Sequence, residues 1–369
     1  MKARLGDYIK EYSVRNKAVE DIPVYSVTNT QGFCRDYFGK EVASKDKSTY
    51  KIVPKGCFAF NPSRINVGSV DWQRYEERVI VSPLYNVFSV SPQLNQQYLY
   101  YYLKSDFALQ RIRAVATGSV RDNLKLDMLY EFPITIPDIE TQRDIAHRLD
   151  SVKNTISLRE KELQTLDNLI KARFVEMFGT PFMNEKHWIN GTIGDVVTEV
   201  RYGTSRPAVD GGKYPYLRMN NLTSDGYIDL NNLKRIDIPD EEVEKCIVRK
   251  GDILFNRTNS VELVGKTALF DLDEEMIIAG YIIRVRLKPI LLPEIFAQYM
   301  NLKPVKDLLR SMAKCAVNQA NINAQELQGI RVFIPNIELQ KEFVSFKKQI
   351  DKSKFAVQQS ICNKMEVIL

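Results

Sequence analysis

The chain has 369 residues, enough for two domains with ordinary cores, and its 44% hydrophobic content favours a globular protein over a disordered or fibrous one. The formal net charge of +6 is mildly basic and points only weakly to nucleic acid. The start of the chain has no apolar signal segment, and no apolar run approaches the roughly 18 residues of a membrane span. We therefore expect a soluble, cytoplasmic protein with no membrane partner.

Cysteine and histidine usage argues against a metal centre. The five cysteines are scattered without a CxxC pair, and the two histidines have no ligand-like neighbours in sequence. A zinc site or a disulfide framework is therefore not expected.

The chain contains a long internal repeat. LGDYI at 5–9 resembles IGDVV at 193–197, and VPKGCFAFN at 53–61 resembles VRKGDILFN at 248–256. Further on, IPDIETQRD at 136–144 returns as IPNIELQKE at 334–342. Repeats of this length indicate two copies of one domain, with small loop insertions accounting for the drift in spacing.

Each copy predicts the same order of elements. A strand-like stretch is followed by a Lys-Gly turn, an apolar strand and further β-rich sequence. Helices are expected next, one starting at Ser91-Pro92 or at Leu292-Pro293, where serine or proline suits a helix start. A second short helix (106–116; 304–315), a polar loop and a last apolar strand complete each copy. The predicted domains are 1–138 and 179–335.

After each copy the hydrophobic period becomes that of a coiled coil. No proline or glycine occurs between Asp138 and Phe178, so we predict helices over 139–178 and 336–369. The seam positions are Leu149, Val152, Ile156, Leu163, Leu166 and Ile170 in the first helix, and Phe343, Ile350, Val357 and Ile361 in the second. A pseudo-two-fold axis relating the copies predicts antiparallel pairing. Lysines at 347, 354 and 364 interrupt the second stripe.

The repeated IP phrase marks the start of each long helix. Proline ends the strand, Asp138 or Asn336 is a plausible N-cap, and Glu140 or Glu338 favours the positive end of the helix dipole. A well-capped helix start explains the whole phrase, and we assign no chemistry to it.

Basic residues cluster at matching places in the two copies. Residues 109–125 carry four cations against one acid, and residues 303–323 repeat this imbalance. A solvated helix face is the simpler explanation for one cluster, but the duplication favours a shared polyanionic partner. Two locally basic domains on a helical spacer suit two separated sites on duplex DNA.

No catalytic constellation stands out. VGKT at 264–267 lacks the glycine at position 260 that a phosphate-binding loop needs, and Phe60-Asn61-Pro62-Ser63 lacks the second proline and aromatic of an amino-methyltransferase pocket. The histidines do not support a serine triad, and the abundant carboxylates lie on predicted surface helices. The sequence therefore indicates a binding architecture.

The duplicated pattern resembles the specificity (S) subunit of type I restriction-modification enzymes over essentially the whole chain. ITIPDIETQ (134–142) and VFIPNIELQ (332–340) carry the resemblance, with support from Lys55-Gly56, KGDILF (250–255) and TGSVR (117–121). Asp138 and Asn336 replace a frequent second proline, and CAVNQ (315–319) stands where a Gly-Ser/Thr pair is usual.

The resemblance implies a non-catalytic DNA-recognition subunit of α+β fold. Two pseudo-symmetric β-rich target-recognition domains, separated by two long antiparallel coiled-coil helices, would each read half of a bipartite target in double-stranded DNA. The helices would dock two modification (methyltransferase) subunits, and restriction/motor subunits would join them. S-adenosylmethionine, ATP and Mg²⁺ would belong to those partners, with no catalytic, cofactor or metal residue in this chain.

Loop side chains before the repeated phrase are the candidates for DNA contact, because they make bidentate bonds to base edges or bind phosphates. Base contacts are expected from Asn61, Arg64, Arg121 and Asn123 in the first copy, and from Arg201, Tyr202, Ser205, Arg206, Arg257, Asn259, Gln319, Asn321 and Asn323 in the second. Phosphate contacts are expected from Arg111, Arg113, Lys125, Arg310 and Lys314. For any single residue, an ordinary solvated side chain is an equal alternative.

Three alternatives remain open. The chain is also consistent with a specificity subunit that serves modification alone, which a genome neighbourhood without a motor gene would distinguish. A coiled-coil assembly scaffold would bind DNA weakly and without sequence preference. A stand-alone methyltransferase is opposed by the missing cofactor turn and would be revived by S-adenosylmethionine binding to the isolated chain.

Overall fold

The computed structural model describes residues 2–35, 46–116, 123–316 and 319–365. The chain forms two compact units, Met1–Glu160 with Gln359–Leu369, and Lys161–Gln358. Within the described ranges, no helix has the length and apolar character needed to cross a membrane.

The first unit is built on a four-stranded antiparallel sheet. Its order is β2 (Ile9–Glu11), β9 (Asn86–Val90), β6 (Phe58–Phe60) and β7 (Val70–Trp72). The two-stranded pairs are β1 (Lys2–Arg4) with β10 (Pro133–Thr135), β3 (Ser26–Thr28) with β4 (Gly32–Cys34), and β5 (Lys51–Pro54) with β8 (Arg78–Val81). The helices are η1 (Leu5–Asp7), η2 (Ile65–Val67), α1 (Gln96–Lys104), α2 (Asp106–Val115) and α3 (Leu126–Tyr130).

The second unit repeats this plan with longer strands. Its corresponding sheet has the order β12 (Val197–Tyr202), β20 (Ile282–Leu287), β16 (Ile253–Asn256) and β18 (Thr267–Leu269). The other sheets are β14 (Lys234–Ile236), β13 (Tyr214–Leu217), β19 (Met276–Ile278) and β15 (Ile247–Val248); β17 (Thr258–Asn259), β22 (Gln319–Asn321) and β21 (Lys314–Ala316); and β11 (Ile189–Thr192) with β23 (Arg331–Ile334). The helices are α5 (Ile193–Val196), η3 (Met219–Asn221), α6 (Asp240–Cys246), α7 (Pro293–Met300), α8 (Lys303–Met312) and α9 (Ala324–Gln328).

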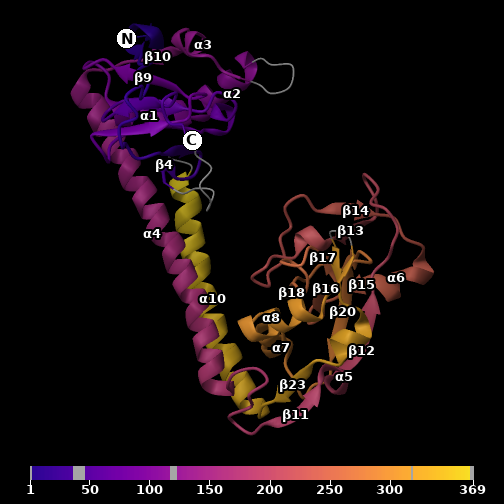
Figure 1. The fold of residues 1–369 in the computed structure, drawn as a ribbon. Coiled ribbons are helices and arrows are strands. Elements are labelled where there is room, and N and C mark those ends of the chain that lie inside the picture. Colours follow the sequence, from indigo (N-terminus) through magenta and orange to yellow (C-terminus); the bar gives the residue numbers. More distant parts are fainter. Residues whose placement is uncertain (1, 36–45, 117–122, 317–318, 366–369) are drawn as a thin grey trace. The chain divides into compact units, whose positions relative to one another are not determined.

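The repeat predicted from sequence is therefore a repeat of structure. The strand order β2-β9-β6-β7 matches β12-β20-β16-β18, and in each unit the first strand pairs with the last, β1 with β10 and β11 with β23. Figure 1 shows both β-rich units in their chain colours, each with two short helices beside its sheets, α1 and α2 or α7 and α8. The predicted α+β fold with two pseudo-symmetric β-rich domains and two long helices is confirmed.

Apolar strand residues and the helices that cover them form the core of each unit. In the first unit, the fully buried rings of Phe58 and Phe88 stack on neighbouring strands with centroids 5.1 Å apart. The Lys-Gly turns that precede β6 and β16 place Gly56 at φ +86° and Gly251 at φ +96°, a conformation that glycine adopts without strain. Both copies thus enter the central sheet through the same turn.

One predicted helix start is correct and one is wrong. Pro293 opens α7 directly after its N-cap, Leu292. In the first unit, by contrast, Ser91-Pro92 does not start a helix, because α1 begins at Gln96 and the Asn95 side chain accepts a hydrogen bond from the Tyr98 N–H. Asn95, four residues after Ser91, is the better-placed cap.

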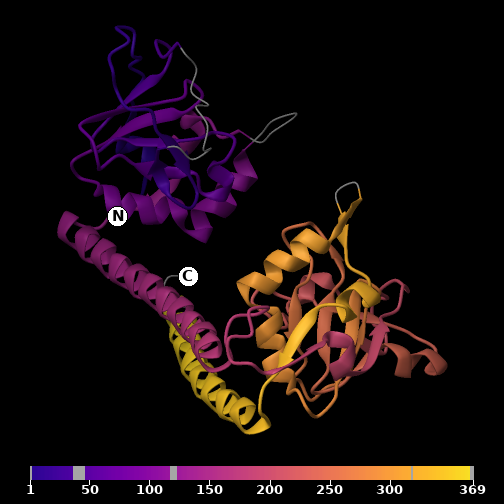
Figure 2. The ribbon, with the colours of Figure 1, turned by 60° about the horizontal axis from the view of Figure 1, so that its bottom comes forward.

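The two predicted long helices are α4 (Ile139–Phe178) and α10 (Ile337–Met365). In the second unit they run antiparallel, because Asp167 of α4 meets Lys354, and Arg173, one to two turns later on α4, meets Glu342, earlier on α10. Their side-by-side course there is visible in both views, with α4 in magenta and α10 in yellow (Figure 1 and Figure 2). Antiparallel pairing of these segments agrees with the sequence prediction.

The apolar seam in the second unit merges with the core of the β-rich part. Ile170 and Phe343 are buried at 3% and 0% exposure, and Val357 is 7% exposed. Leu163, Leu166 and Ile350 are half-buried, and the ring of Phe174 meets that of Phe343 edge-on at 5.3 Å. In the first unit, the seam positions Leu149, Val152, Ile156 and Ile361 are half-buried as well.

The helix caps expected in the repeated phrase are present. The Asp138 carboxylate accepts hydrogen bonds from the N–H (2.9 Å) and hydroxyl (2.6 Å) of Thr141, and these bonds lower the pKa of Asp138. Asn336 accepts a bond from the Glu338 N–H at 2.8 Å. Both side chains satisfy orphan donors at a helix start.

The cap does not explain the glutamine of the phrase, however. Gln142 is fully buried, and its amide oxygen accepts the Asn95 N–H at 2.8 Å. Its amide nitrogen donates to the carbonyls of Gln93 and Pro137, both at 2.9 Å. One side chain therefore binds the start of the long helix to the loop in front of α1.

Gln340 makes the same three bonds in the second unit. Its oxygen accepts the Leu292 N–H at 2.8 Å, and its nitrogen donates to the carbonyls of Ile290 (3.0 Å) and Pro335 (2.9 Å). It is also fully buried. The interpretation of the phrase as a helix start alone was incomplete, because a buried amide also joins each long helix to its domain.

We predict that Gln340→Leu destabilises the second unit by about 2 to 3 kcal/mol, because it keeps the volume and leaves one N–H and two carbonyls buried without partners. The chain has two tryptophans. Urea unfolding followed by Trp188 fluorescence in a Trp72→Phe background measures the effect. Gln349→Leu, at an exposed position of the same helix, is the matched control. Equal unfolding midpoints for the two variants would contradict the role of the buried amide.

Candidate nucleic-acid interface

Three of the predicted residues of the second copy meet at the end of β16. The Arg257 guanidinium donates to the Asn321 side-chain oxygen at 3.2 Å and lies 4.9 Å from the centroid of the Tyr202 ring. Tyr202 is 42% exposed, and its hydroxyl accepts the Ala324 N–H at 2.9 Å. Stacking and hydrogen bonding hold the arginine plane in one orientation at the surface.

The neighbouring turn is held by asparagines. Asn256 is fully buried and donates to the carbonyls of Thr258 and Tyr281, both at 3.1 Å. Asn259 donates to the Asn256 side-chain oxygen at 2.9 Å and accepts the Ser260 N–H at 2.9 Å. The Asn259 side chain is therefore used to shape the turn next to Arg257.

The equivalent loop of the first unit brings two other predicted residues together. Asn61 accepts the Ser63 N–H at 3.1 Å, and the Ser63 hydroxyl donates to Asn123 at 2.7 Å. Arg64 follows on this loop and is exposed. Among the residues that the structure describes, no side chain binds its guanidinium.

The two loops share a backbone contact although their side chains differ. The Leu124 N–H donates to the Pro62 carbonyl at 3.2 Å, and the Ile322 N–H donates to the Arg257 carbonyl at 2.9 Å. Pro62 and Arg257 occupy corresponding positions, directly after Asn61 and Asn256. The same framework thus presents an arginine in one unit and a proline in the other.

Several other candidates of the second unit already bind protein groups. Arg201 pairs with Glu199 at 2.5 Å, and Arg206 makes a two-pronged contact with Glu242 at 2.7 and 3.1 Å. Asn323 caps α9 by accepting the N–H groups of residues 325 and 326, both at 2.9 Å. A DNA contact by these three side chains requires an exchange of partner.

The basic helices present their candidates at the surface. Arg111 lies 5.4 Å from the Phe132 ring, and Arg113 donates to the Asn66 carbonyl at 3.2 Å, while Arg310 pairs with Asp307 at 3.2 Å. The exposed candidates also include Lys125, Ser205 and Gln319.

Two candidates cannot be placed fully. Arg121 lies outside the described residues, and so does the TGSVR stretch around it. Lys314 begins β21, but its side chain is outside the described part of the structure. The role of both in DNA contact stays a prediction, as it does for the other candidates.

Sequence reasoning missed Tyr281. Its side chain is 51% exposed, and its carbonyl accepts the Arg257 N–H at 2.9 Å. The turn Ala279-Gly280-Tyr281 inside an otherwise apolar strand run was the available signal. Tyr281 therefore lies next to the Arg257 cluster, directly before β20, in a stretch that was predicted from sequence only as β-rich.

Lys306, in the basic stretch of the second copy, is largely withdrawn from solvent. Its ammonium donates to the Gly265 carbonyl at 2.9 Å. Burial, with the charges of Arg310 and Lys266 nearby, lowers its pKa to about 8. This lysine secures the loop after the Arg257 turn, so the basic stretch is not uniformly a solvated face.

Comparison with known proteins shows to which family this chain belongs. The chain matches the family described as the type I restriction modification DNA specificity domain twice, over residues 5–168 and 185–367. The chain belongs to this family. The two matches coincide with the two halves of the repeat, so the specificity domain is present in two copies.

The relatives that the chain resembles are named as specificity subunits. The EcoKI specificity subunit of Escherichia coli K12 is 23% identical over 69% of this chain and 58% of its own length. The StySPI specificity subunit of Salmonella potsdam is 21% identical over 93% and 78%. The putative MjaX specificity subunit of Methanocaldococcus jannaschii is 28% identical over 44% of this chain. The match spans 39% of the MjaX subunit. This chain therefore covers less than two thirds of the length of both the EcoKI and the MjaX subunits.

Solved structures share the fold of this specificity chain. A chain from a study of complex assembly and conformational transition in a type I restriction-modification system has a TM-score of 0.61 at 16% identity, covering 100% of this chain and 95% of that one. The S subunit of M. genitalium has a TM-score of 0.52 at 14% identity, with coverages of 100% and 93%. At these identities the similarity shows the fold.

We predict a pH-dependent contribution of Lys306 to the stability of this specificity chain. Its folded pKa is below the usual 10.5, so between about pH 8 and 10.5 the unfolded chain binds more protons and the free energy of unfolding rises with pH. Relative to Lys306→Met, the wild-type value should rise by about 2 kcal/mol from pH 8 to pH 10. Urea unfolding followed by Trp188 fluorescence in a Trp72→Phe background measures this difference.

Lys303→Met provides the matched control for that measurement. Lys303 lies on the same helix with 85% of its side chain exposed. Its removal should leave the pH profile parallel to that of the wild type. A profile of Lys306→Met parallel to the wild type would show that Lys306 carries no shifted proton equilibrium.

Proposed function

We propose that this chain is the non-catalytic DNA-recognition subunit of a type I restriction-modification complex. Each β-rich domain reads one half of a bipartite target in double-stranded DNA. The observation that supports this best is the pair of equivalent segments after β6 and at the end of β16, Asn61–Arg64 and Asn256–Asn259, which share a backbone contact and carry different side chains. Common geometry with different side chains suits two domains that read different bases.

The second-domain loop has the chemistry of base recognition. A guanidinium held flat by Tyr202 and oriented by Asn321 is prepared for a bidentate contact with a base edge. The exposed ring of Tyr281 beside it offers a stacking or groove contact. In the first domain, Arg64 takes the corresponding role, next to Ser63, whose hydroxyl donates to Asn123.

The long helices carry apolar side chains that a partner protein can cover. In the second unit, Leu169, Val175 and Phe355 are 45%, 38% and 61% exposed. Such side chains favour protein contact over DNA contact. They support docking of the modification subunits on the helices, with restriction/motor subunits joining the assembly through them.

The chemistry of modification is assigned to those partners. S-adenosylmethionine would bind in the modification subunits, and ATP with Mg²⁺ in the motor subunits. Membership of the specificity family supports this division, in which this chain would contribute sequence recognition.

We predict that Arg257→Ala weakens recognition of one half-site and leaves the other intact. Loss of one bidentate base contact corresponds to about 1 to 3 kcal/mol of discrimination at one base pair. The measurement is single-molecule methylome sequencing of a host that expresses the chain with its modification subunit. Relaxation of both half-sites by Arg257→Ala would refute modular reading.

Arg64→Ala is the reciprocal variant and should relax the other half-site. Arg249→Ala is the matched control, because this arginine of the second domain pairs with Glu244 and Glu275 and is not a candidate for DNA contact. Its methylome should equal that of the wild type. Absence of any bipartite methylated motif in the wild type would contradict the proposed function itself.

A further inference from the structure

The lysines that interrupt the apolar stripe of α10 include one buried charge. Lys354 is 7% exposed, and its ammonium donates to the Asp167 carboxylate of α4 at 2.5 Å and to the Tyr227 hydroxyl at 2.6 Å. The ammonium also lies 4.6 Å from the centroid of the Tyr227 ring. One side chain of α10 thus joins the other long helix and a loop of the β-rich part.

The charge is retained despite burial. Burial lowers the pKa of Lys354, but the hydrogen bonds to Asp167 and Tyr227 outweigh it and raise the pKa above its usual value. The buried Lys354 ammonium meets its acceptors, Asp167 and Tyr227, in one alignment of α10 along α4. Sliding α10 along α4 would remove the carboxylate and leave the charge unpaired, which is strongly unfavourable.

The apolar residues of α4 recur at alternating spacings of three and four, as in Leu163, Leu166 and Ile170. On α10, Lys354 stands between Ile350 and Val357 in the corresponding stripe. With an apolar residue at position 354, a slide by one turn would bring apolar side chains opposite apolar side chains along this stretch. A single buried polar contact is the feature that distinguishes alignments in such helix pairs. Lys354 with Asp167 has this character.

The Tyr227 contact is made by a constrained loop. The Tyr227 N–H donates to the Thr223 hydroxyl at 2.9 Å, and Gly226 has φ +88°. A side chain at Gly226 would approach the amide of Asn301 and the carbonyl of Thr267, so the loop fits closely against its neighbours. The loop therefore transmits the position of Lys354 to the β-rich part of the second unit.

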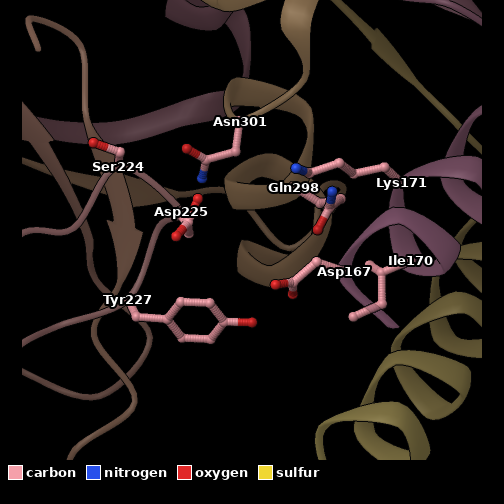
Figure 3. A pocket seen from close by; sticks show the side chains of 8 residues that line it. All are labelled: Asp167, Ile170, Lys171, Ser224, Asp225, Tyr227, Gln298 and Asn301. Carbon is pink, nitrogen blue, oxygen red and sulfur yellow. The ribbon is translucent and has the colours of Figure 1, made fainter. Parts of the chain in front are cut away.

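Figure 3 shows the side of this contact that faces α7. Tyr227 points its hydroxyl toward the Asp167 carboxylate, next to a cavity of about 40 Å³ lined by Gln298 and Asn301 among others. A space of that size can hold water. The cluster is a structural contact between elements of one unit.

We propose that Lys354 is a positioning residue that sets the axial register of α10 against α4 through Asp167, and fixes the second domain at that register through Tyr227. The consequence for DNA rests on the proposed function. The register determines where the second reading domain sits along the helix pair, and so contributes to the number of base pairs between the half-sites. A slide of one helical turn, about 5.4 Å, corresponds to about one or two base pairs of duplex.

The register is measurable in the full chain without DNA. Spin labels at Asn168→Cys on α4 and Lys348→Cys on α10, both exposed, report the distance between the helices. The background is Cys34→Ser, Cys315→Ser and Cys362→Ser. Pulsed electron resonance should give one narrow distance with the native Lys354 contact.

The decisive variant replaces the pair with apolar side chains, Asp167→Leu with Lys354→Met. Such replacements commonly preserve stability, so urea midpoints should change little. The distance distribution should gain a second population displaced by about 5 Å along the helix axis. A single unchanged distance in a folded variant would overturn the proposal.

Two further variants sharpen this result. Lys341→Met is the matched control, because Lys341 bonds Glu338 of its own helix at 2.8 Å and 60% of its side chain is exposed; the distance in this variant should equal that of the wild type. Asp167→Lys combined with Lys354→Asp restores an opposite-charge pair and should return the single distance. A mixed distribution in this swapped pair would also count against the proposal.

The DNA consequence is tested separately by methylome sequencing with the modification subunit. The wild type should methylate half-sites at one spacing, and the apolar pair variant should add sites whose spacer differs by one or two base pairs. A shifted helix distance with an unchanged spacer would leave the register role standing and reject its effect on the target. A wild type without bipartite methylation would reject the proposed function, while the spin-label distances still decide the register.

Discussion

A buried glutamine amide joins each long helix to its β-rich unit, and the placement of the candidate DNA-contact segments depends on that joint. Gln142 and Gln340 are fully buried, and each binds one N–H and two carbonyls. An amide matches this set because it carries an acceptor and a double donor on one rigid group. Rotation of the domain on its helix would break all three bonds together, so the joint is stiff at the residue where a flexible hinge would otherwise be expected.

The two units use one backbone plan for different surfaces. Their central sheets have the same strand order, and the same turn glycines introduce β6 and β16. Differences are concentrated after those strands, where Pro62 stands in one unit and Arg257 in the other. A framework that fixes the backbone leaves the side chains of the loop free to vary without disturbing the core.

Much of this arrangement was predictable from sequence, and the failures have a common physical cause. The repeat, the long helices and the Lys-Gly turns depend on local patterns, so they were found. The roles of Gln142 and Lys354 depend on partners about 50 and about 190 residues away in the chain, which spacing alone does not reveal. The prediction of Ser91 as a helix cap was wrong because Asn95 caps this helix instead. The sequence placed Lys306 in a solvated stretch because its burial depends on the carbonyl of Gly265, in a distant turn.

The pairing of first and last strands has a consequence for how the chain folds during synthesis. Lys2 of β1 can pair only after Thr135 of β10 has been synthesised, and Ile189 of β11 can pair only after Ile334 of β23 has been synthesised. Each unit therefore closes late, through contacts between distant parts of its sequence, which slows folding. Since α10 follows both β-rich parts in the chain, Ile170 and Phe174 of α4 lack their partner Phe343 until α10 has been synthesised. During that interval the apolar face of α4 in the nascent chain is exposed to solvent. The chain is then most prone to aggregation, and another protein that covers this face would protect it.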